Sequence, residues 1–385
     1  MYNKLLKIAM YAIALNIFFT PLNGGIARLF GYMTILLTWA YPVVRTFIKR
    51  RPEMNIWVLI LIGVVLFSVA LNLGSFRMDN ASATIISIVS FVVFYWSVSF
   101  DRDENRTMDL RFFFRLNYVL CAIFILYAFG PFDFKYTQIN SSGAESFTMG
   151  LGNPNAVSGY VMFSIVLLIM QQTHLKKRVY KVLNLLLTGV ILYILYLLSS
   201  RTVLACVLGI VVFVLVRRHG KMGRWIPYIA MLIPVLMISA QILLAEYDIT
   251  VEILGKPLMS GRDKLYMEAI EEIRARPQML VFGDIFYYCF ENLHNAPLSI
   301  LATLGISGLV MYWVFWLRLL RNLNRTSVGR EYMIAYVCVL AYVVHSSSEI
   351  MFMAGAVPYC FFVLITVRIA KGEIRMPDTQ NRISA

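Results

Sequence analysis

Two arginines and one histidine are the residues of this sequence best suited to chemistry on a charged substrate. Arg201 lies in "YLLSSRTVLACVL", between two apolar runs and without an acidic neighbour in sequence. Arg262 lies in "MSGRDKLYMEAIEEI", where a cation in the first turn of a helix opposes the helix dipole and is easier to understand if an anion binds there. His294 stands at the start of an apolar run, and histidine readily exchanges protons near neutral pH. The three residues are therefore candidates for anion binding and proton transfer.

Four more polar residues are candidates for binding a sugar, namely Asn153, Asn155, His345 and Glu349. Asn153 and Asn155 offer amide groups in "FTMGLGNPNA", and His345 and Glu349 delimit "HSSSE". Each has a structural alternative, because asparagines often cap helix starts and either member of the second pair could cap a helix end. Arg262 could likewise be a solvated loop arginine, since most arginines are exposed.

Metal and nucleotide chemistry are not indicated by the sequence. It contains neither an H-E-x-x-H motif nor a cluster of cysteine and histidine with the spacing of metal ligands. It also lacks a Gly-rich phosphate loop. We therefore expect no metal site, no cofactor and no use of ATP.

The amino-acid composition indicates whether these residues act in water or in a membrane. Hydrophobic residues make up 59% of the 385 positions and charged residues only 15%, against about 45–50% and about 25% in soluble domains. The sequence predicts an all-α, polytopic membrane protein whose residues 1–385 form a single integral membrane domain. The net charge of +14 is then explained by basic cytoplasmic loops, so we expect no nucleic acid partner.

Apolar runs of about 20 residues predict transmembrane helices. The first run follows a basic lead like a signal peptide, but it lacks a cleavage site and is interpreted as a retained span. The twelve predicted spans are Leu5–Thr20, Ala27–Val44, Ile56–Leu73, Ala83–Phe100, Phe112–Phe129, Ala156–Gln171, Val182–Leu198, Thr202–Val216, Ile226–Leu244, Ala296–Leu317, Tyr332–His345 and Ile350–Val367.

The distribution of basic residues predicts the orientation of the spans. With the N-terminus in the cytoplasm, the inside loops hold "FIKRRPE", "HLKKRVYK", "RRHGKMGR" and "RLLRNLNRTSVGR". This satisfies the positive-inside rule, and twelve spans place both termini in the cytoplasm. The basic residues left on the outside are Arg28, Arg77, Lys135, Arg201, Lys256, Arg262, Lys264, Arg274 and Arg276.

The orientation places every candidate site residue on the outer face. Arg201 falls in the turn between the seventh and eighth spans. Residues 246–295 form one long extracytoplasmic loop between spans nine and ten. Within it, Ser260 and Asp263 have the spacing of a capping box, and Pro277 ends the pattern. The apolar stripe of an amphipathic helix on the membrane surface is Leu265, Ala269, Ile270 and Ile273.

Three of these stretches together resemble the O-antigen ligase and O-antigen polymerase superfamily. They are "LSSRT", "SGRDKLYMEAIEEIRARPQMLVFGD" and "HNAPLSILATLGISGLVMYW". A fourth, "GLGNPNAVSGY", is similar to a segment common in the polymerases. The resemblance covers residues Met149 to Trp313, and the twelve-span arrangement agrees with it over the whole chain.

The resemblance implies a metal-independent, inverting glycosyltransferase. Members of the family transfer a glycan from an undecaprenyl-pyrophosphate carrier, on the outer leaflet of the cytoplasmic membrane, to a sugar hydroxyl. Matched by motif, Arg201 and Arg262 are expected to hold the pyrophosphate and His294 to lie near the acceptor. Glu349 is a second candidate base, by position only. The implied partners are a lipid-linked oligosaccharide, membrane lipids, and a chain-length regulator or a flippase.

Three functions remain open at this stage. The first is a repeat-unit polymerase for O-antigen, capsule or exopolysaccharide, which the modest length of the outer loop favours. The second is a ligase that transfers finished polymer to a lipid A core or another acceptor. The third is a non-enzymatic flippase or exporter, which the near absence of charged residues within the spans argues against.

Overall fold

The computed structural model describes residues 2–49, 56–75, 81–99, 107–139, 145–216, 223–247, 252–253, 256–257, 262–288, 293–326, 329–347 and 357–376. Helices make up 84% of these residues. Because lipid offers no hydrogen-bond partners, an apolar chain satisfies its backbone there by forming helices. The architecture is consistent with an all-α membrane protein.

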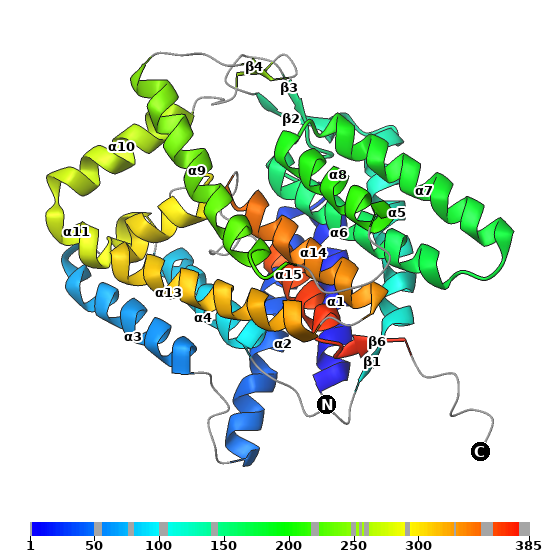
Figure 1. Ribbon diagram of the computed structural model, residues 1–385, viewed down its shortest axis with the longest axis horizontal. Coiled ribbons are helices and arrows are strands. Elements are labelled where there is room, and N and C mark those ends of the chain that lie inside the picture. The colour runs from blue at the N-terminus through cyan, green and yellow to red at the C-terminus, as the bar shows by residue number, and fades with distance from the viewer. Residues whose placement is uncertain are drawn as a thin grey trace.

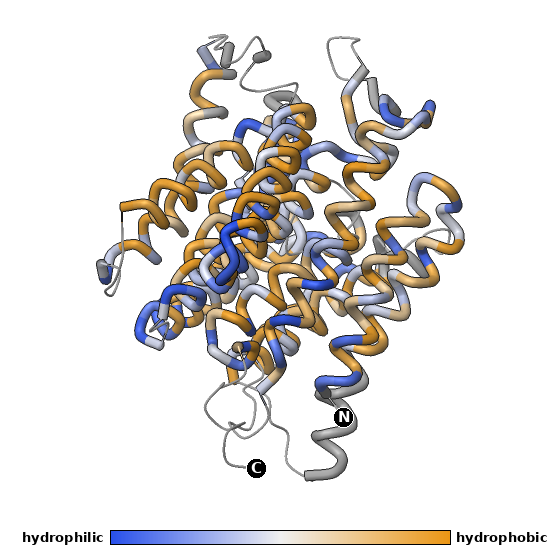
Figure 2. The backbone as a smooth tube through the Cα atoms, turned by 90° about the vertical axis from the view of Figure 1, so that its right-hand side faces the viewer, coloured by the Kyte–Doolittle hydropathy of each residue, from blue (hydrophilic) through white to orange (hydrophobic). Residues whose placement is uncertain are grey.

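Twelve helices of the described chain coincide with the twelve predicted spans. They are α1 (Tyr2–Phe19), α2 (Gly24–Lys49), α3 (Ile56–Leu71), α4 (Ala81–Ser99), α5 (Leu110–Phe129), α6 (Pro154–His174), α7 (Arg178–Leu197), α8 (Arg201–Val216), α9 (Ile226–Glu246), α13 (Ala296–Thr326), α14 (Arg330–His345) and α15 (Val357–Ala370). Five of them, α5, α6, α7, α9 and α13, contain stretches long and apolar enough to cross a membrane. The crossing of a membrane by all twelve helices and the position of the termini stay predictions. Figure 2 shows apolar residues along most of the helical length.

The remaining elements are short. The loop after α9 holds α10 (Arg262–Ala275), α11 (Pro277–Phe282) and α12 (Ile285–Tyr288). Two 3-10 turns are η1 (Leu73–Ser75) and η3 (Asp133–Lys135). The strands are β1 (Met108–Asp109), β2 (Tyr136–Ile139), β3 (Glu145–Phe147), β4 (Glu252–Ile253), β5 (Lys256–Pro257) and β6 (Ile374–Arg375), which pair as parallel β1–β6 and antiparallel β2–β3 and β4–β5.

The two ends of the helix bundle differ in what they hold. Figure 1 places β1 and β6 at the lower end, with the start of α1, and β2, β3 and β4 at the upper end. At the lower end the guanidinium of Arg368 is fully buried and pairs with Glu373 at 2.5 Å. This ion pair lies at the C-terminal end of α15, at the lower end of the bundle.

Helix α14 lies at the centre of the bundle. Its residues 334–343 are all buried, and α14 contacts α6, α8, α9, α13 and α15. A helix that is apolar on every side must be surrounded on every side. Helix α6 also approaches α15 closely, because a Cβ on Gly159 would lie only 2.0 Å from the ring of Tyr359 in α15. Small residues allow such backbone approach between membrane helices.

Candidate functional site

The C-terminal end of α14 brings together polar residues from distant parts of the chain. We call Asn295, His345, Ser346, Ser347 and Tyr359 the α14-end cluster. Asn295, His345, Ser346 and Ser347 are each at most 1% exposed, and so is Tyr359. Buried polar groups are retained only where they are hydrogen-bonded or serve a function.

Asn295 ties the start of α13 to the end of α14. Its Nδ2 donates to the carbonyl oxygens of Ser347 at 3.3 Å and Pro234 at 3.4 Å. Its Oδ1 accepts from the backbone N–H of Leu298 at 3.0 Å, which caps α13. The backbone N–H of Ala296 donates to the Ser346 carbonyl at 2.8 Å. The predicted loop residue His294, which precedes Asn295, is thereby held beside the α14 end.

His345 and Tyr342 link α14 to α15 and α6, respectively. Its Nδ1 lies 3.1 Å from the hydroxyl of Tyr359. The hydroxyl of Tyr342, one turn earlier on α14, lies 3.5 Å from the Gly159 carbonyl in the first turns of α6. The start of α6, where Asn153 lies, is therefore at the same end of the bundle as His345.

Helix α8 begins with Arg201 at this same end of the bundle. Asn184 of α7 donates to Leu168 and Gln172 of α6 at 3.0 and 2.9 Å, so α6 and α7 run antiparallel. Helix α7 consequently ends level with the start of α6, and Arg201 is the first residue of α8, four residues after the end of α7. Its side chain is half-buried. Helix α8 packs along α14, with the Cys206 sulfur 3.5 Å from the Ala341 carbonyl.

Helix α10 brings Arg262 towards His294. The hydroxyl of Tyr266 donates to the His294 carbonyl at 3.5 Å. Arg262, the first residue of α10, lies four positions before Tyr266. The backbone of Arg262 therefore lies one helical turn before the residue of α10 that contacts His294.

The apolar face of α10 packs against protein. Tyr266, Ala269 and Ile273 are buried together with residues of the chain before and within α13. We expected this face to lie on the membrane surface, and the difference arises because Leu298 and Ala302 offer a nearer apolar surface. The prediction of a helix ended by Pro277 is confirmed, because α10 ends at Ala275 and α11 begins at Pro277.

Strained backbone marks the helix starts of the site. Among the described residues, those other than glycine with positive φ are Met149 (54°), Ser199 (54°) and His294 (49°). They lie just before α6, α8 and α13, the helices that begin at or beside Asn153, Arg201 and Asn295. Such conformations cost on the order of 1–3 kcal/mol each and concentrate at functional sites.

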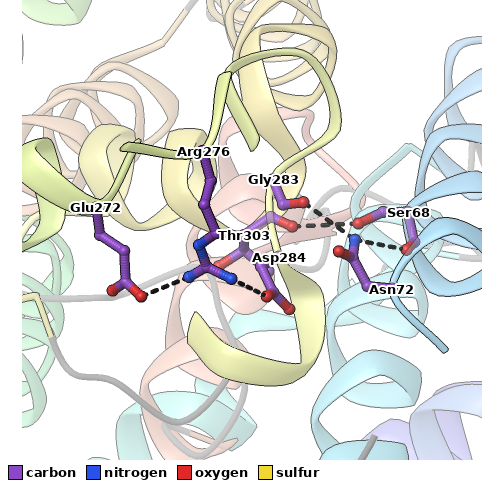
Figure 3. A network of polar contacts seen from close by, with 7 residues as sticks. All are labelled: Ser68, Asn72, Glu272, Arg276, Gly283, Asp284 and Thr303. Atoms are coloured by element: carbon purple, nitrogen blue, oxygen red, sulfur yellow. Dashed lines mark hydrogen bonds and ion pairs between the residues drawn. The ribbon is translucent and has the colours of Figure 1, made fainter. Parts of the chain in front are cut away.

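A polar network anchors the loop that carries α10 to α12. Arg276 pairs with Glu272 at 2.5 Å and with the buried carboxylate of Asp284 at 3.2 Å, and the backbone N–H of Asp284 donates to the Ala302 carbonyl at 2.8 Å. Figure 3 shows how these side chains face the helix that carries Ser68. The ion pairs thus connect parts of the loop to one another, and the Asp284 backbone joins the loop to α13.

Helix α3 completes this network from the other side. The Ser68 hydroxyl donates to the Phe282 carbonyl at 2.8 Å, and Asn72 Nδ2 donates to the Gly283 carbonyl at 3.0 Å. These bonds satisfy backbone carbonyls where the loop crosses α13. Figure 3 shows the bond of Asn72 to Gly283 and a second bond of Ser68, to the Thr303 carbonyl. The crossing holds the loop segment that follows α10 against α3 and α13.

Asn153 and Asn155 are the two predicted site residues at the start of α6. Asn153 caps the helix, because its side chain accepts from the Asn155 backbone N–H at 2.9 Å, so its structural alternative is confirmed. Asn155 is the second residue of α6, and its side chain is half-buried. Glu349 and the capping residue Ser260 lie outside the described residues.

No group of three or more His, Cys, Asp or Glu side chains in the described chain could hold a metal ion. No family model matches the sequence. A search of curated proteins finds no match either.

Sequence reasoning missed two members of the site, Tyr266 and Tyr359. Tyr266 follows Arg262 by one helical turn, a spacing that signals a shared face. Tyr359 lies in an apolar run with nothing in the sequence to connect it to His345, because their contact depends on how α14 and α15 pack.

Proposed function

We propose that the protein is a polysaccharide repeat-unit polymerase of the cytoplasmic membrane. It would transfer a growing glycan from undecaprenyl pyrophosphate to a lipid-linked repeat unit at the outer face. The observation that carries this proposal is the convergence of Arg201, His294, His345 and the start of α10 at one end of α14. The sequence resemblance assigns Arg201 and Arg262 to the donor pyrophosphate and His294 to the acceptor sugar, and His345 is a candidate for sugar binding by its position.

The proposed reaction is a single displacement at the anomeric carbon of the donor sugar. The acceptor hydroxyl oxygen forms the new bond to this carbon from the face opposite the leaving group. The bond between the carbon and the pyrophosphate oxygen breaks, and undecaprenyl pyrophosphate leaves with the electron pair. The hydroxyl proton passes to a base, for which His294 is the leading candidate.

Arg201 and Arg262 would stabilise the leaving group. Negative charge grows on the pyrophosphate oxygens as the bond breaks. Guanidinium groups pair bidentately with phosphate oxygens and stay charged at every physiological pH. Donors fixed in position where charge develops supply a large share of catalysis in many enzymes. Two arginines from separate helix starts could bind the two phosphates from different sides.

A site at the end of the helix bundle suits a substrate with a lipid tail. The undecaprenyl chain can stay in the bilayer while the sugars remain in water. Arg201 follows the apolar α7 and opens the apolar α8, a position expected near the interface. An arginine costs about 2.5–3.5 kcal/mol at the bilayer centre, and less near the surface.

A deletion strain tests the proposed function by the glycan it accumulates. If the protein is the polymerase, a gel of cell-surface glycans shows single repeat units in the deletion strain and long chains after complementation. A ligase would instead leave long chains attached to the carrier lipid. Unchanged polymer, of normal length and attached to its normal acceptor, would refute both glycosyl transfers.

A further inference from the structure

A cavity lies at the end of the bundle opposite the α14-end cluster. It has a volume of about 500 Å³ and opens between the starts of α1 and α5. Its lining includes Lys7 and Tyr11 of α1, and Arg111 and Arg115 of α5. This is the end at which β1 and β6 pair, directly before α5 (Figure 1).

The cavity carries an excess of positive charge. Its lining holds three cationic side chains and one carboxylate, that of Asp109. The carboxylate is engaged by Arg111, with Nε at 3.1 Å from both oxygens and a terminal nitrogen at 3.0 Å. In the part of the chain that the structure describes, neither Lys7 nor Arg115 forms an ion pair. Two cations therefore remain available to an anion.

The two helices that form the cavity run in the same direction. Near their starts, Lys7 Nζ lies 5.1 Å from the ring centre of Phe112, and the Tyr11 ring lies 5.6 Å from it. Near their ends, the rings of Phe18 and Tyr127 stack at 6.1 Å. Residue numbers thus rise together along both helices.

This parallel arrangement gives the cavity a polar end and an apolar end. On α1, Lys7 is followed one turn later by Tyr11, which is 53% exposed. On α5, Arg111 and Arg115 are followed by Val119, which is 49% exposed. Arg111 and Val119 are about 12 Å apart along the helix at 1.5 Å per residue. Over this distance the lining changes from charged side chains to exposed apolar side chains. That gradient matches a molecule with a charged head and a hydrocarbon tail.

We propose that this cavity binds an anionic glycerophospholipid of the membrane leaflet at this end of the protein. Its phosphate accepts from Lys7 and Arg115, and its acyl chains lie along Tyr11 and Val119. Basic pockets between membrane helices are suited to lipid headgroups. A soluble phosphate would meet the same cations but leave the apolar wall unused. The proposal is independent of the glycosyl transfer at the opposite end.

Lipid binding to the purified full-length protein tests the proposal. The protein is delipidated in a non-ionic detergent and titrated with phosphatidylglycerol, and bound lipid is counted by native mass spectrometry. We expect Lys7→Gln with Arg115→Gln to weaken binding at least about tenfold, since both lost bonds are charge-assisted. The matched control, Lys177→Gln with Lys181→Gln, removes two exposed lysines near the start of α7 and should leave binding within about twofold.

Three further measurements decide the chemistry of the ligand. The exchange Lys7→Arg with Arg115→Lys keeps both charges and should retain binding. Phosphatidylcholine should bind much more weakly, and millimolar inorganic phosphate or glycerol phosphate should not displace phosphatidylglycerol. Displacement by free phosphate would overturn the lipid proposal in favour of a soluble phosphate.

The proposal is also overturned if the Gln pair binds phosphatidylglycerol as the unaltered protein does, or if the control pair loses binding equally. Arg115→Gln alone changes an exposed side chain, so it provides a second variant should the pair fail to fold. It should weaken binding severalfold, and unaltered binding would contradict the cavity's role.

Discussion

At the scale of single residues, His294 combines two properties that ordinary loop residues lack. Its backbone is left-handed, with φ of 49°, and its carbonyl accepts from Tyr266. Histidine is one of the residues that enters this region more readily than most. Backbone geometry alone could therefore explain a histidine here, and an experiment must separate the conformation from the imidazole.

Replacing His294 by Asn separates these two roles. Asparagine tolerates the left-handed backbone equally well but cannot accept a proton near neutral pH. We expect glycan transfer by isolated membranes to fall by about 10²–10⁴-fold, the usual contribution of a general base, while the thermal unfolding temperature stays near that of the unaltered protein. His294→Gly, which removes the backbone strain, should be equally inactive. Retained transfer in either variant would show that the imidazole is not the base.

At the scale of elements, the crossing of the loop and α13 depends on two glycines. Gly283 and Gly305 both have positive φ, of 65° and 66°. A Cβ on Gly283 would lie 2.2 Å from the Thr303 carbonyl carbon, and one on Gly305 would lie 2.2 Å from that of Val281. The two backbones touch where Gly305 interrupts the helical geometry of α13.

Gly283→Ala and Gly305→Ala should each destabilise the protein strongly. Overpacking costs about 1–3 kcal/mol and the positive φ adds about 1 kcal/mol, so we expect a loss of about 2–4 kcal/mol. The control is Gly63→Ala on α3, where a Cβ meets no atom within 4 Å and stability should change by less than about 1 kcal/mol. Thermal unfolding of purified protein measures all three. Equal unfolding temperatures would show that the crossing is not a tight backbone contact.

At the scale of the whole molecule, apolar runs predicted where helices form, because a long apolar run has no other stable arrangement in lipid. Each of the twelve predicted segments overlaps a helix of the described chain, the last of them only from Val357 onward. Their pairing could not be predicted, since it depends on contacts such as Asn184 with α6 or Cys206 with α14. The central position of α14 is therefore a result of the structure alone.

The candidate site was predictable to a similar extent. Arg201, Arg262 and His294 stand out in sequence by charge and position, but Tyr266 and the α14-end cluster depend on tertiary contacts. Asn153 was ambiguous as a sugar-binding or capping residue; its bond to Asn155 shows that it caps α6, and sugar binding stays a prediction. Sequence thus identifies unusual charges, while the fold identifies which of them converge.

Glycan transfer by the purified protein in lipid nanodiscs is the most direct test of the central claim, which is that Arg201 holds a polyprenyl pyrophosphate at the α14 end. The substrate is an undecaprenyl-pyrophosphate-linked repeat unit, and released undecaprenyl pyrophosphate is quantified. We predict that Arg201→Ala lowers the rate at least about a hundredfold, as for loss of one transition-state donor. Arg178→Ala, which removes the first residue of α7, should retain the full rate. Equal rates for both variants, or no release by the unaltered protein, would contradict the account.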